Sequence, residues 1–560
     1  MALEVDHPKL LPHTTGRRAV LFLAVCAFLQ LCALPCLCTR KPAKPRDRLA
    51  PILAYIHSDW ALLTRSMNDC RSVADPKLTR ASRLYLPKGF PEPAAVRTLE
   101  KSCNVQVLYL PVPIDHPGAT DVDIRQHGLL YLPNPYVVPG GRFNEMYGWD
   151  SYFIILGLLR DGERERARGM VENFFFEIQR YGTLLNANRT YYLTRSQPPF
   201  LTSMILQVYR AQQESGHGDN EWLKIAYEFA ARDYQMWTRD PHLAGATGLS
   251  RYFDFGDGPA PESVAGEPGY YRSVARYFLL HPDLGRRYLT LPAGIDPARA
   301  SPGDVRLNSL YYKGDRSMRE SGFDISFRFR PYGAGTQDFA PVCLNSLLYK
   351  TEKDLEEMAR ALGRPDAVQS WRQRADVRRR RIDQYLWDPS RGLYFDYNFA
   401  TGSRSGYEYA TTFYPLWAGA ASPEQAKAVA GNLRIFERSG GLATSTQTTG
   451  VQWDYPYGWA PLQLLAVQGL RRYGFDAEAN RVAEKFLSTV AADFEKEGTI
   501  REKYNVVTRS SDAPVVAGYR TNVIGFGWTN GVFVELLHQL PPPLAQELSA
   551  GPSRTSSVGP

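Results

Sequence analysis

PGGRFNEMYGWDSYF, at residues 139–153, is the stretch that decides how this chain is interpreted. Its Pro-Gly-Gly start predicts a tight turn that exposes the residues after it. Arg142, Glu145, Trp149 and Asp150 follow, so a cation, two carboxylates and an indole stand directly before an apolar helical pattern. A buried salt-bridge cluster at a helix start is one interpretation. The density of glycine, tryptophan and charge favours the other, which is a binding or catalytic site.

A second stretch, QWDYPYGWAP at residues 452–461, has the same character and also precedes a helical pattern. It brings Trp453, Asp454 and Trp459 close together in the chain. Sugar sites use such mixtures because hydroxyls need carboxylate and amide partners, whereas ring faces need aromatic platforms. We expect both stretches to line a sugar pocket, and core packing is the alternative for each tryptophan.

Around these stretches, apolar residues recur at three- and four-residue intervals, which predicts amphipathic helices. Residues 392–398 (GLYFDYN) alternate after a turn at 388–391 and predict a small β-hairpin arm. The pattern predicts one large all-α domain of paired helices arranged as a toroid, with long loops that form a pocket. The predicted helices are 150–160, 163–181, 200–215, 220–239, 339–362, 367–386, 423–436, 460–473 and 477–494.

Composition and charge argue against nucleic acid as a partner. Aromatic residues make up 12% of the 560 residues, which suits a pocket that grips sugar rings, although a large aromatic core would also account for it. The net charge is +8, but basic and acidic residues are interleaved. The local run of arginines at 378–381 lies in a helical pattern and is expected to be a solvated helix face.

The N-terminal residues 1–38 are expected to be a signal peptide or an N-terminal anchor. Arg17 and Arg18 precede an apolar run at 19–38, and a basic, proline-rich linker follows at 39–48. If the apolar run is not cleaved, it is long enough to span a bilayer, so membrane contact is expected only in that case. We therefore expect a periplasmic or secreted protein.

The rest of the chain is predicted to be one catalytic domain at 49–540, a monomer, and a disordered tail at 541–560 that is rich in Pro, Ser and Gly. Cys70 and Cys103 could pair in an oxidising compartment, but three cysteines in the body do not make a disulfide framework. The body has no CxxC pair and no HxxxH spacing, so no metal site is expected.

The two stretches resemble the two signatures of the trehalases, glycoside hydrolase family 37, and among these the chain resembles a bacterial periplasmic trehalase. The resemblance implies an (α/α)6 toroid with short β-hairpin arms. It also implies hydrolysis of α,α-trehalose to two glucose molecules with inversion, without metal or cofactor. It extends over nearly the whole body, to NANRTYYLTRSQPP (186–199), ESGFDIS (320–326), EKY (502–504) and GFGWTNGV (525–532).

Site roles follow from the resemblance, position by position. Asp324, which ends ESGFD, matches the catalytic acid, and Glu502, in EKYN, matches the base that activates water. The positions that match the family's substrate contacts are Arg142, Trp149, Asp150, Asn186, Arg195, Ser196, Gln197, Glu262 and Gly322.

Acetal hydrolysis supports these two roles on physical grounds. One carboxyl must be protonated to donate to the leaving oxygen, and an ionised carboxylate must face the opposite side of the ring. Asp324 stands between Phe323 and Ile325, where desolvation is expected to raise its pKa. Glu502 stands next to Arg501 and Lys503, and either cation would keep it ionised if it points that way.

Two positions depart from the family pattern. Ala260 stands where the family usually has an arginine before Pro-Glu, and Ile524 where it has a glutamate before Gly-Phe-Gly-Trp. Arg272 and Arg276 are the candidates to replace the missing arginine. The alternative functions are hydrolysis of another small α-glucoside, or an inactive sugar-binding homologue, which predicts loss of the acid or the base.

Overall fold

A computed structural model describes residues 47–74, 81–116, 118, 124, 126–266, 269–291, 300–517 and 521–551. The expected signal segment at 1–38 and the linker up to residue 46 lie outside these residues. Within them no helix combines the length and the apolar character needed to cross a bilayer.

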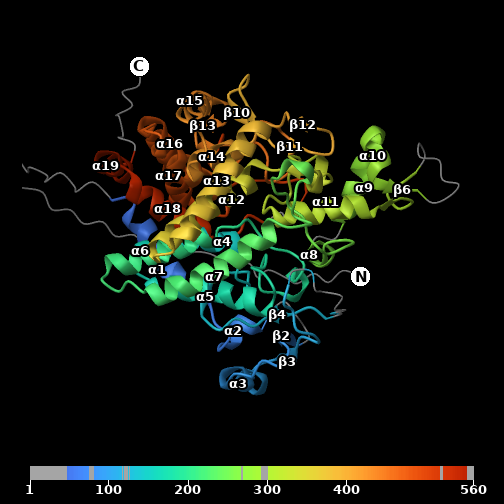
Figure 1. The fold of residues 1–560 in the computed structure, drawn as a ribbon, viewed down its shortest axis with the longest axis vertical. Coiled ribbons are helices and arrows are strands. Elements are labelled where there is room, and N and C mark those ends of the chain that lie inside the picture. Colours follow the sequence, from blue (N-terminus) through green and yellow to red (C-terminus); the bar gives the residue numbers. More distant parts are fainter. Residues whose placement is uncertain are drawn as a thin grey trace, which may run out of the picture. The chain divides into compact units, whose positions relative to one another are not determined.

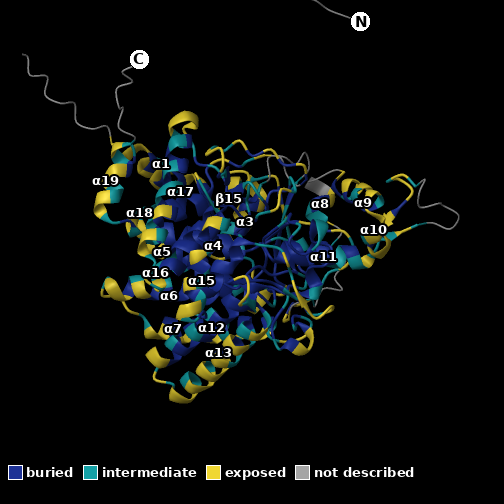
Figure 2. Ribbon diagram, turned by 90° about the horizontal axis from the view of Figure 1, so that it is seen from above, coloured by how far each residue is buried: buried dark blue, intermediate teal, exposed yellow. Residues whose placement is uncertain are grey.

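Six helices form the inner layer of the described structure. The packing passes from α4 to α6, α12, α14, α16 and α18, and from α18 back to α4 (Figure 1). These helices are buried on most sides, and in α4 every residue from Gly148 to Leu158 is buried (Figure 2). Their bounds are α4 Gly148–Arg160, α6 Leu201–Glu214, α12 Val342–Ala361, α14 Tyr414–Ala418, α16 Ala460–Arg472 and α18 Gly527–Gln539.

Glycine allows the closest of these contacts. A Cβ on Gly531 of α18 would lie 2.0 Å from the backbone oxygen of Phe153 on α4, and one on Gly157 would lie 2.6 Å from Gly531 Cα. The backbones of α4 and α18 can therefore touch only because both positions lack a side chain.

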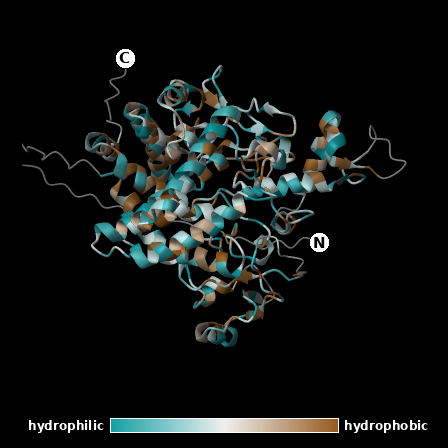
Figure 3. Ribbon diagram, in the orientation of Figure 1, coloured by the Kyte–Doolittle hydropathy of each residue, from teal (hydrophilic) through white to brown (hydrophobic). Residues whose placement is uncertain are grey.

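Helices with one apolar face pack outside this layer. Their bounds are α1 Ala50–Leu63, α5 Arg164–Arg180, α7 Asn220–Trp237, α13 Pro365–Tyr385, α15 Pro423–Gly431 and α17 Asp476–Glu497. In α13 the buried residues are Ala375, Arg378 and Ile382, which are spaced by three and four and so form one stripe. The rest of α13 is mainly hydrophilic (Figure 3).

The nine predicted helices are confirmed, with ends within three residues of the prediction in eight cases. The exception is 423–436, where α15 ends at Gly431 and a short 3-10 turn, η6 at Leu433–Ile435, follows. Asn432 interrupts the helix because its amide donates to the backbone oxygens of Arg391 and Gly392.

The all-α expectation holds only for the larger part of the chain, because a parallel sheet lies near the N-terminus of the described residues. Its strands are β2 Ser82–Leu86, β3 Val105–Tyr109 and β4 Leu129–Leu130, in the order β3-β2-β4. The helix α3 at Ala94–Ser102 connects β2 to β3, and a disulfide joins Cys70, on α2 Cys70–Val73, to Cys103. The Cys70–Cys103 pairing that the sequence left open is thus present in the structure.

The other strands form short ladders between the helices. The turn after β9 leads into β10, which confirms the predicted hairpin arm. These ladders are β1 Thr64–Arg65 with β5 Tyr136–Val137; β6 Leu289–Thr290 with β7 Arg306–Leu307; β8 Phe339–Ala340, β11 Tyr397–Asn398 and β12 Ser403–Arg404; β9 Trp387–Asp388 with β10 Leu393–Tyr394; β13 Glu437–Arg438 with β14 Gly441–Leu442; and β15 Tyr457–Trp459 with β16 Lys503–Asn505.

A long connection between the outer helix α7 and the inner helix α12 leads to the site. It contains α8 Pro261–Gly266, α9 Tyr270–Leu280, α10 Pro282–Tyr288 and α11 Ser309–Glu320, and α11 ends just before Asp324. The remaining 3-10 turns are η1 Thr190–Tyr192, η2 Gly245–Thr247, η3 Pro331–Gly333, η4 Thr336–Asp338 and η5 Ala410–Phe413.

The predicted disordered tail is wrong for its first part, because α19 spans Pro542–Ala550. Leu544 and Leu548 lie one turn apart and pack on the core, and the backbone amide of Arg48 donates to the Ser549 oxygen at 3.0 Å. This apolar face makes a helix favourable in a segment whose composition alone indicated disorder. Residues 552–560 lie outside the described part.

Candidate active site

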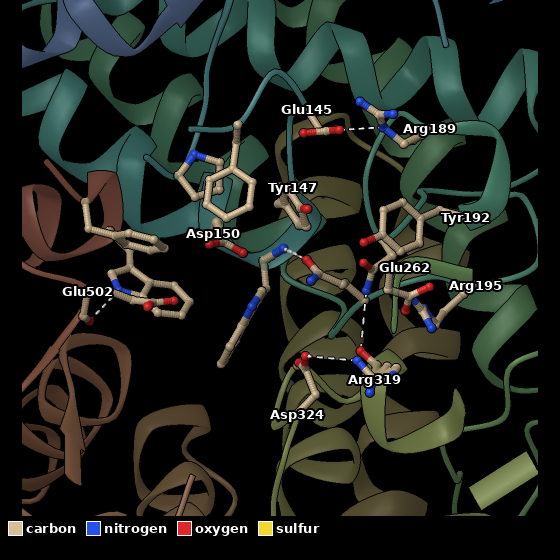
Figure 4. A pocket seen from close by; sticks show the side chains of 18 of the residues that line it. Glu145, Tyr147, Asp150, Arg189, Tyr192, Arg195, Glu262, Arg319, Asp324 and Glu502 are labelled. Atoms are coloured by element: carbon tan, nitrogen blue, oxygen red, sulfur yellow. Dashed lines mark hydrogen bonds and ion pairs between the residues drawn. The ribbon is translucent and has the colours of Figure 1, made fainter. Parts of the chain in front are cut away.

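A cavity of about 420 Å³ opens where several inner helices begin. Trp149 and Asp150 stand in the first turn of α4, Trp459 directly precedes α16, and Trp528 is the second residue of α18. The sequence stretches 139–153 and 452–461 therefore meet in one cavity. The predicted site residues that line it are Arg142, Trp149, Asp150, Asn186, Arg195, Gln197, Glu262, Gly322, Asp324 and Glu502 (Figure 4).

Ser196 is the predicted site residue that does not line the cavity. Its hydroxyl donates to the backbone oxygen of Leu184 at 2.6 Å, and its amide donates to Glu320 at 3.4 Å. Both contacts turn Ser196 into the protein behind the wall. It holds the position of Arg195 and Gln197 on either side rather than reaching the cavity.

Asp324 reaches the cavity from the segment after α11. Its neighbours Phe323 and Ile325 point into the core and are fully buried or nearly so, while the Asp324 side chain keeps 36% of its surface exposed. Arg319 Nη1 lies 3.8 Å from Asp324 Oδ2. The flanking apolar residues therefore do not enclose the carboxyl as the sequence led us to expect, because Phe323 and Ile325 pack in two separate hydrophobic clusters.

Glu502 reaches the cavity from another part of the chain, directly before β16. Its backbone amide donates to Val523 O at 3.0 Å, and Trp528 Nε1 donates to its backbone oxygen at 3.2 Å. Lys503 Nζ lies 3.1 Å from Glu502 Oε2, and both side chains are almost completely buried. Arg501 instead contacts Asn522 O, at 3.2 Å, and Glu497, at 3.4 Å, so Lys503 is the neighbouring cation that points toward the carboxylate.

Asp150 lies in the cavity with Asp324 and Glu502 (Figure 4). Burial, and then the nearby charges of Glu502 and Asp324, raise the pKa of Asp150 well above its usual value. Three carboxyl groups that face one cavity cannot all be ionised at low cost. Of the three, Asp150 is the carboxyl whose protonated form burial favours.

Arginines paired with carboxylates line another side of the cavity. Arg195 forms an ion pair with Glu262, and its Nη1 lies 3.6 Å from Asp254 Oδ2. Arg189 pairs with Glu145 (Figure 4). Burial acts against ionisation of Glu145, but the Arg189 guanidinium holds the pKa of Glu145 below its ordinary value. These fixed charges present donors and acceptors to a polar ligand.

Tryptophan rings close the remaining wall. Trp453 stacks on Trp459 with ring centroids 3.8 Å apart, and Trp149 packs edge-on against Trp528 at 5.6 Å. Trp459 Nε1 donates to Gln452 O at 3.0 Å, and Gln452 in turn donates to the backbone oxygen of Asp324. The tryptophans are both core and cavity wall, so the two interpretations of them are compatible.

The two departures from the family pattern lie at different depths. Ala260 is fully buried, and its amide donates to Tyr271 Oη at 2.7 Å. Ile524 keeps 55% of its surface exposed and lies outside the cavity lining. Arg272 and Arg276 are exposed on α9 and also lie outside that lining, so the suggestion that either replaces the missing arginine is wrong.

Arg319 is the arginine that the sequence analysis missed. Its Nε lies 3.3 Å from Asp315 Oδ2, and the same carboxylate accepts from Tyr271 Oη at 2.9 Å. Arg319 stands one residue before ESGFD, so proximity to that motif was the available signal. Three of the other lining residues, Glu145, Trp453 and Trp459, were singled out in the two stretches expected to line the pocket, which the cavity confirms. The lining residues that were not singled out are Pro139, Phe143, Asn144, Tyr147, Arg189, Tyr191, Tyr192, Gln452, Phe526 and Trp528.

Comparison with known proteins agrees with this geometry. The trehalase family model matches residues 115–541. A probable trehalase of Eremothecium gossypii is 37% identical over 552 residues, covering 88% of this chain and 72% of its own. A cytosolic neutral trehalase of Saccharomyces cerevisiae is 36% identical over 537 residues, which cover 85% of this chain and 69% of its own. The solved structure of a neutral trehalase from Saccharomyces cerevisiae has a TM-score of 0.73 and 33% identity, covering 90% of this chain and 96% of its own.

Proposed function

This chain belongs to the trehalase family and hydrolyses trehalose to glucose, and we propose that it does so with inversion, with Asp324 as general acid and Glu502 as general base. One observation carries the proposal. Two carboxyl groups from distant segments face one cavity, and they approach it from different sides (Figure 4).

The reaction begins at the oxygen that joins the two sugar rings. Asp324 donates its proton to this oxygen as the bond from the oxygen to one anomeric carbon breaks. Glu502 removes a proton from a water on the opposite face of that ring, and the water oxygen bonds to the anomeric carbon. The attacked ring leaves as β-glucose and the other ring as α-glucose. Asp324 ends ionised and Glu502 protonated, so a proton must return through solvent before the next turnover.

The charge state of the two groups suits these steps. Lys503 Nζ, 3.1 Å from Glu502 Oε2, places a positive charge beside the proposed base. A sugar bound in the cavity would displace the water that reaches the half-exposed Asp324 and favour its neutral, proton-donating form. Arg319 would then donate to a sugar hydroxyl near the reacting oxygen, in place of the arginine missing at Ala260.

Substrate contacts are proposed for the other residues on the wall. The neutral Asp150 can both donate to and accept from a sugar hydroxyl. The indoles of Trp149 and Trp453 offer apolar faces to the rings. The remaining proposed contacts are Arg142, Asn186, Arg195, Gln197, Glu262 and the backbone of Gly322.

For the fold, we propose that the described body is an (α/α)6 toroid and that the catalytic domain spans 49–540. The cyclic packing of α4, α6, α12, α14, α16 and α18, with outer helices beside them, supports this. The loops that precede α4, α16 and α18 all contribute to the cavity. We also propose that the active protein is a monomer.

For localisation, we propose a periplasmic or secreted protein. The Cys70–Cys103 disulfide supports an oxidising compartment, and the pattern at residues 1–38 is typical of a signal segment. Fractionation of cells that express the full chain tests this proposal. Activity in the extracytoplasmic fraction, with residues 1–38 removed, is the expected result. Full activity in the cytosol, with both thiols reduced, would contradict it.

Glucose release from trehalose tests the two catalytic roles. Asp324→Asn and Glu502→Gln should each lower kcat by about 10²–10⁴-fold, which is the usual contribution of a general acid or base. Asp257→Asn and Glu497→Gln change exposed residues and serve as matched controls that keep wild-type activity. Wild-type kcat in either catalytic variant, with its melting temperature unchanged, would refute the assignment.

A further inference from the structure

A second cavity, of about 550 Å³, lies between α7, α12, α13 and the loop at 243–250. It shares no lining residue with the catalytic cavity. One face of α13 is turned toward it, since the contributing positions recur at intervals of three, one and three residues. They are Ser370, Gln373, Arg374, Val377, Arg378 and Arg381.

Two arginines make one side of this cavity positive. Arg374 is exposed and Arg381 half-buried, and neither forms an ion pair with an acidic residue in the part of the chain that the structure describes. Arg381 Nη1 donates to Gly248 O at 2.8 Å. Gly248 has φ +67°, and a Cβ there would lie 2.2 Å from Arg381 Cζ, so the loop admits the guanidinium only because this residue is glycine. Two such donor groups on one wall suit a phosphate.

Glu352, on α12, adds a buried carboxylate oxygen to the lining of this cavity. Glu352 is 1% exposed, and its Oε1 accepts from Tyr234 Oη and from Arg378 Nε, both at 2.7 Å. Glu352 Oε2 is buried and has no hydrogen-bond partner among the described residues. A buried acceptor without a donor is costly, so this atom calls for a hydroxyl or amine.

The arginine run at 378–381 is therefore not the solvated helix face that the sequence suggested. Arg378 is buried against Glu352, and Arg381 faces the cavity, whereas Arg379 and Arg380 are exposed. The run divides between two faces of α13 because consecutive residues on a helix point in directions about 100° apart. Of the four arginines, Arg378 and Arg381 line the cavity.

We propose that this cavity binds a small phosphorylated sugar or polyol. The phosphate binds Arg374 and Arg381, and a hydroxyl of the ligand donates to Glu352 Oε2. A free phosphate satisfies only the arginines, and a neutral sugar satisfies only the glutamate, so a ligand that carries both groups fits best. The volume lies within the range of roughly 300–1,000 Å³ for small-molecule pockets.

Isothermal titration of the full chain with glucose 6-phosphate tests the proposal. Saturating glucose is present to occupy the catalytic cavity, so the signal does not depend on the proposed catalytic roles. Binding is expected, and Arg374→Gln and Arg381→Gln should each weaken it about tenfold, the usual effect of losing one charge-assisted hydrogen bond. Arg380→Gln, on the outer face of the same helix, is the matched control and should bind as wild type.

Inorganic phosphate and glycerol 3-phosphate separate the two halves of the site. Phosphate should bind at least about tenfold more weakly than either phosphate ester, because it does not provide a hydroxyl for Glu352. Absence of glucose 6-phosphate binding at millimolar concentration would overturn the proposal. So would equal weakening by Arg380→Gln, or equal affinity for inorganic phosphate. Arg374 makes no hydrogen bond within the described structure, so its variant is expected to keep the wild-type melting temperature.

Discussion

Gly322→Ala perturbs the segment that carries Asp324, the proposed general acid, without changing its carboxyl group. Gly322 has φ +75°, and a Cβ there would lie 2.9 Å from Trp149 Cε2, whereas ordinary contacts begin at 3.4 Å. The strained backbone conformation costs roughly 1–2 kcal/mol of stability. The clash adds a displacement of about 0.5 Å that Trp149 or the backbone before Asp324 must absorb.

Trp149 has little room to move. Phe323, Trp453 and Trp528 surround it at centroid distances of 5.6, 5.9 and 5.6 Å. The backbone must then absorb most of the displacement, and Asp324 is only two residues away. Because a 1 Å error in position can cost about 10²-fold in rate, we expect kcat on trehalose to fall about 10–100-fold, with KM less affected.

Gly363→Ala is the matched control for this substitution. Gly363 has φ +67°, and a Cβ there would have no atom within 4 Å, so this variant has the backbone strain without the clash. Gly363→Ala should lower the melting temperature slightly and Gly322→Ala by more, because the clash adds to the backbone strain, and only Gly322→Ala should lose kcat. The reasoning is refuted if Gly322→Ala keeps kcat within twofold of wild type, or if Gly363→Ala loses as much activity.

Three further predictions address charge, substrate and the disulfide. Burial raises the pKa of Asp233 to about 7. The protonated carboxyl therefore stabilises the fold, and this stabilisation is complete below the pKa of the unfolded chain, which is near 4. The stabilisation is lost as the pH rises toward 7. The stability of Asp233→Asn relative to wild type should therefore rise by about 2–3 kcal/mol between pH 5 and pH 8, measured by urea unfolding, while the exposed Asp376→Asn shows no such change. Arg319→Gln should lower kcat/KM for trehalose about 10–100-fold, through loss of a charge-assisted hydrogen bond. Replacing Cys70 and Cys103 by serine should lower the free energy of unfolding by about 2–4 kcal/mol, because the disulfide closes a loop with a sequence separation of 33 residues.

Each of these has a contradicting outcome. A pH-independent stability difference for Asp233→Asn would show that this carboxyl does not titrate in the native range. Wild-type kcat/KM in Arg319→Gln would exclude its contact with substrate. A double serine variant as stable as the oxidised wild-type protein would mean that the disulfide does not constrain the unfolded chain.

Helical periodicity predicted five of the six outer helices and four of the six inner ones, because one apolar stripe or a long apolar run marks them. The outer helix α1 was not among the predictions. The inner helices α14 and α18 were not among the predictions. Tyr414–Ala418 is too short to show a period, and Gly527–Gln539 contains Gly, Trp, Thr and Asn in its first turns. The apolar surroundings of α18 form only when α4 and α16 pack against it, and no local sequence pattern shows this packing.

The candidate site shows the same limit. The sequence motifs predicted most of the cavity lining, because residues such as Trp149, Asp324 and Glu502 each belong to a short motif. Arg319 was missed and Arg272 was suggested in its place, since distance along the chain from Ala260 does not tell which way a helix turns its side chains. The α9 helix turns Arg272 to solvent, whereas α11 carries Arg319 into the cavity.

Proton NMR of the anomeric signals during trehalose hydrolysis by the full chain tests the central claim most directly. Spectra are recorded in the first minutes, before the released glucose mutarotates. Inversion with Asp324 as acid and Glu502 as base predicts equal early amounts of α- and β-glucose, and neither from Asp324→Asn or Glu502→Gln. Early release of α-glucose alone would mean retention of configuration, and it would contradict the assignment of Glu502 as the base that activates water.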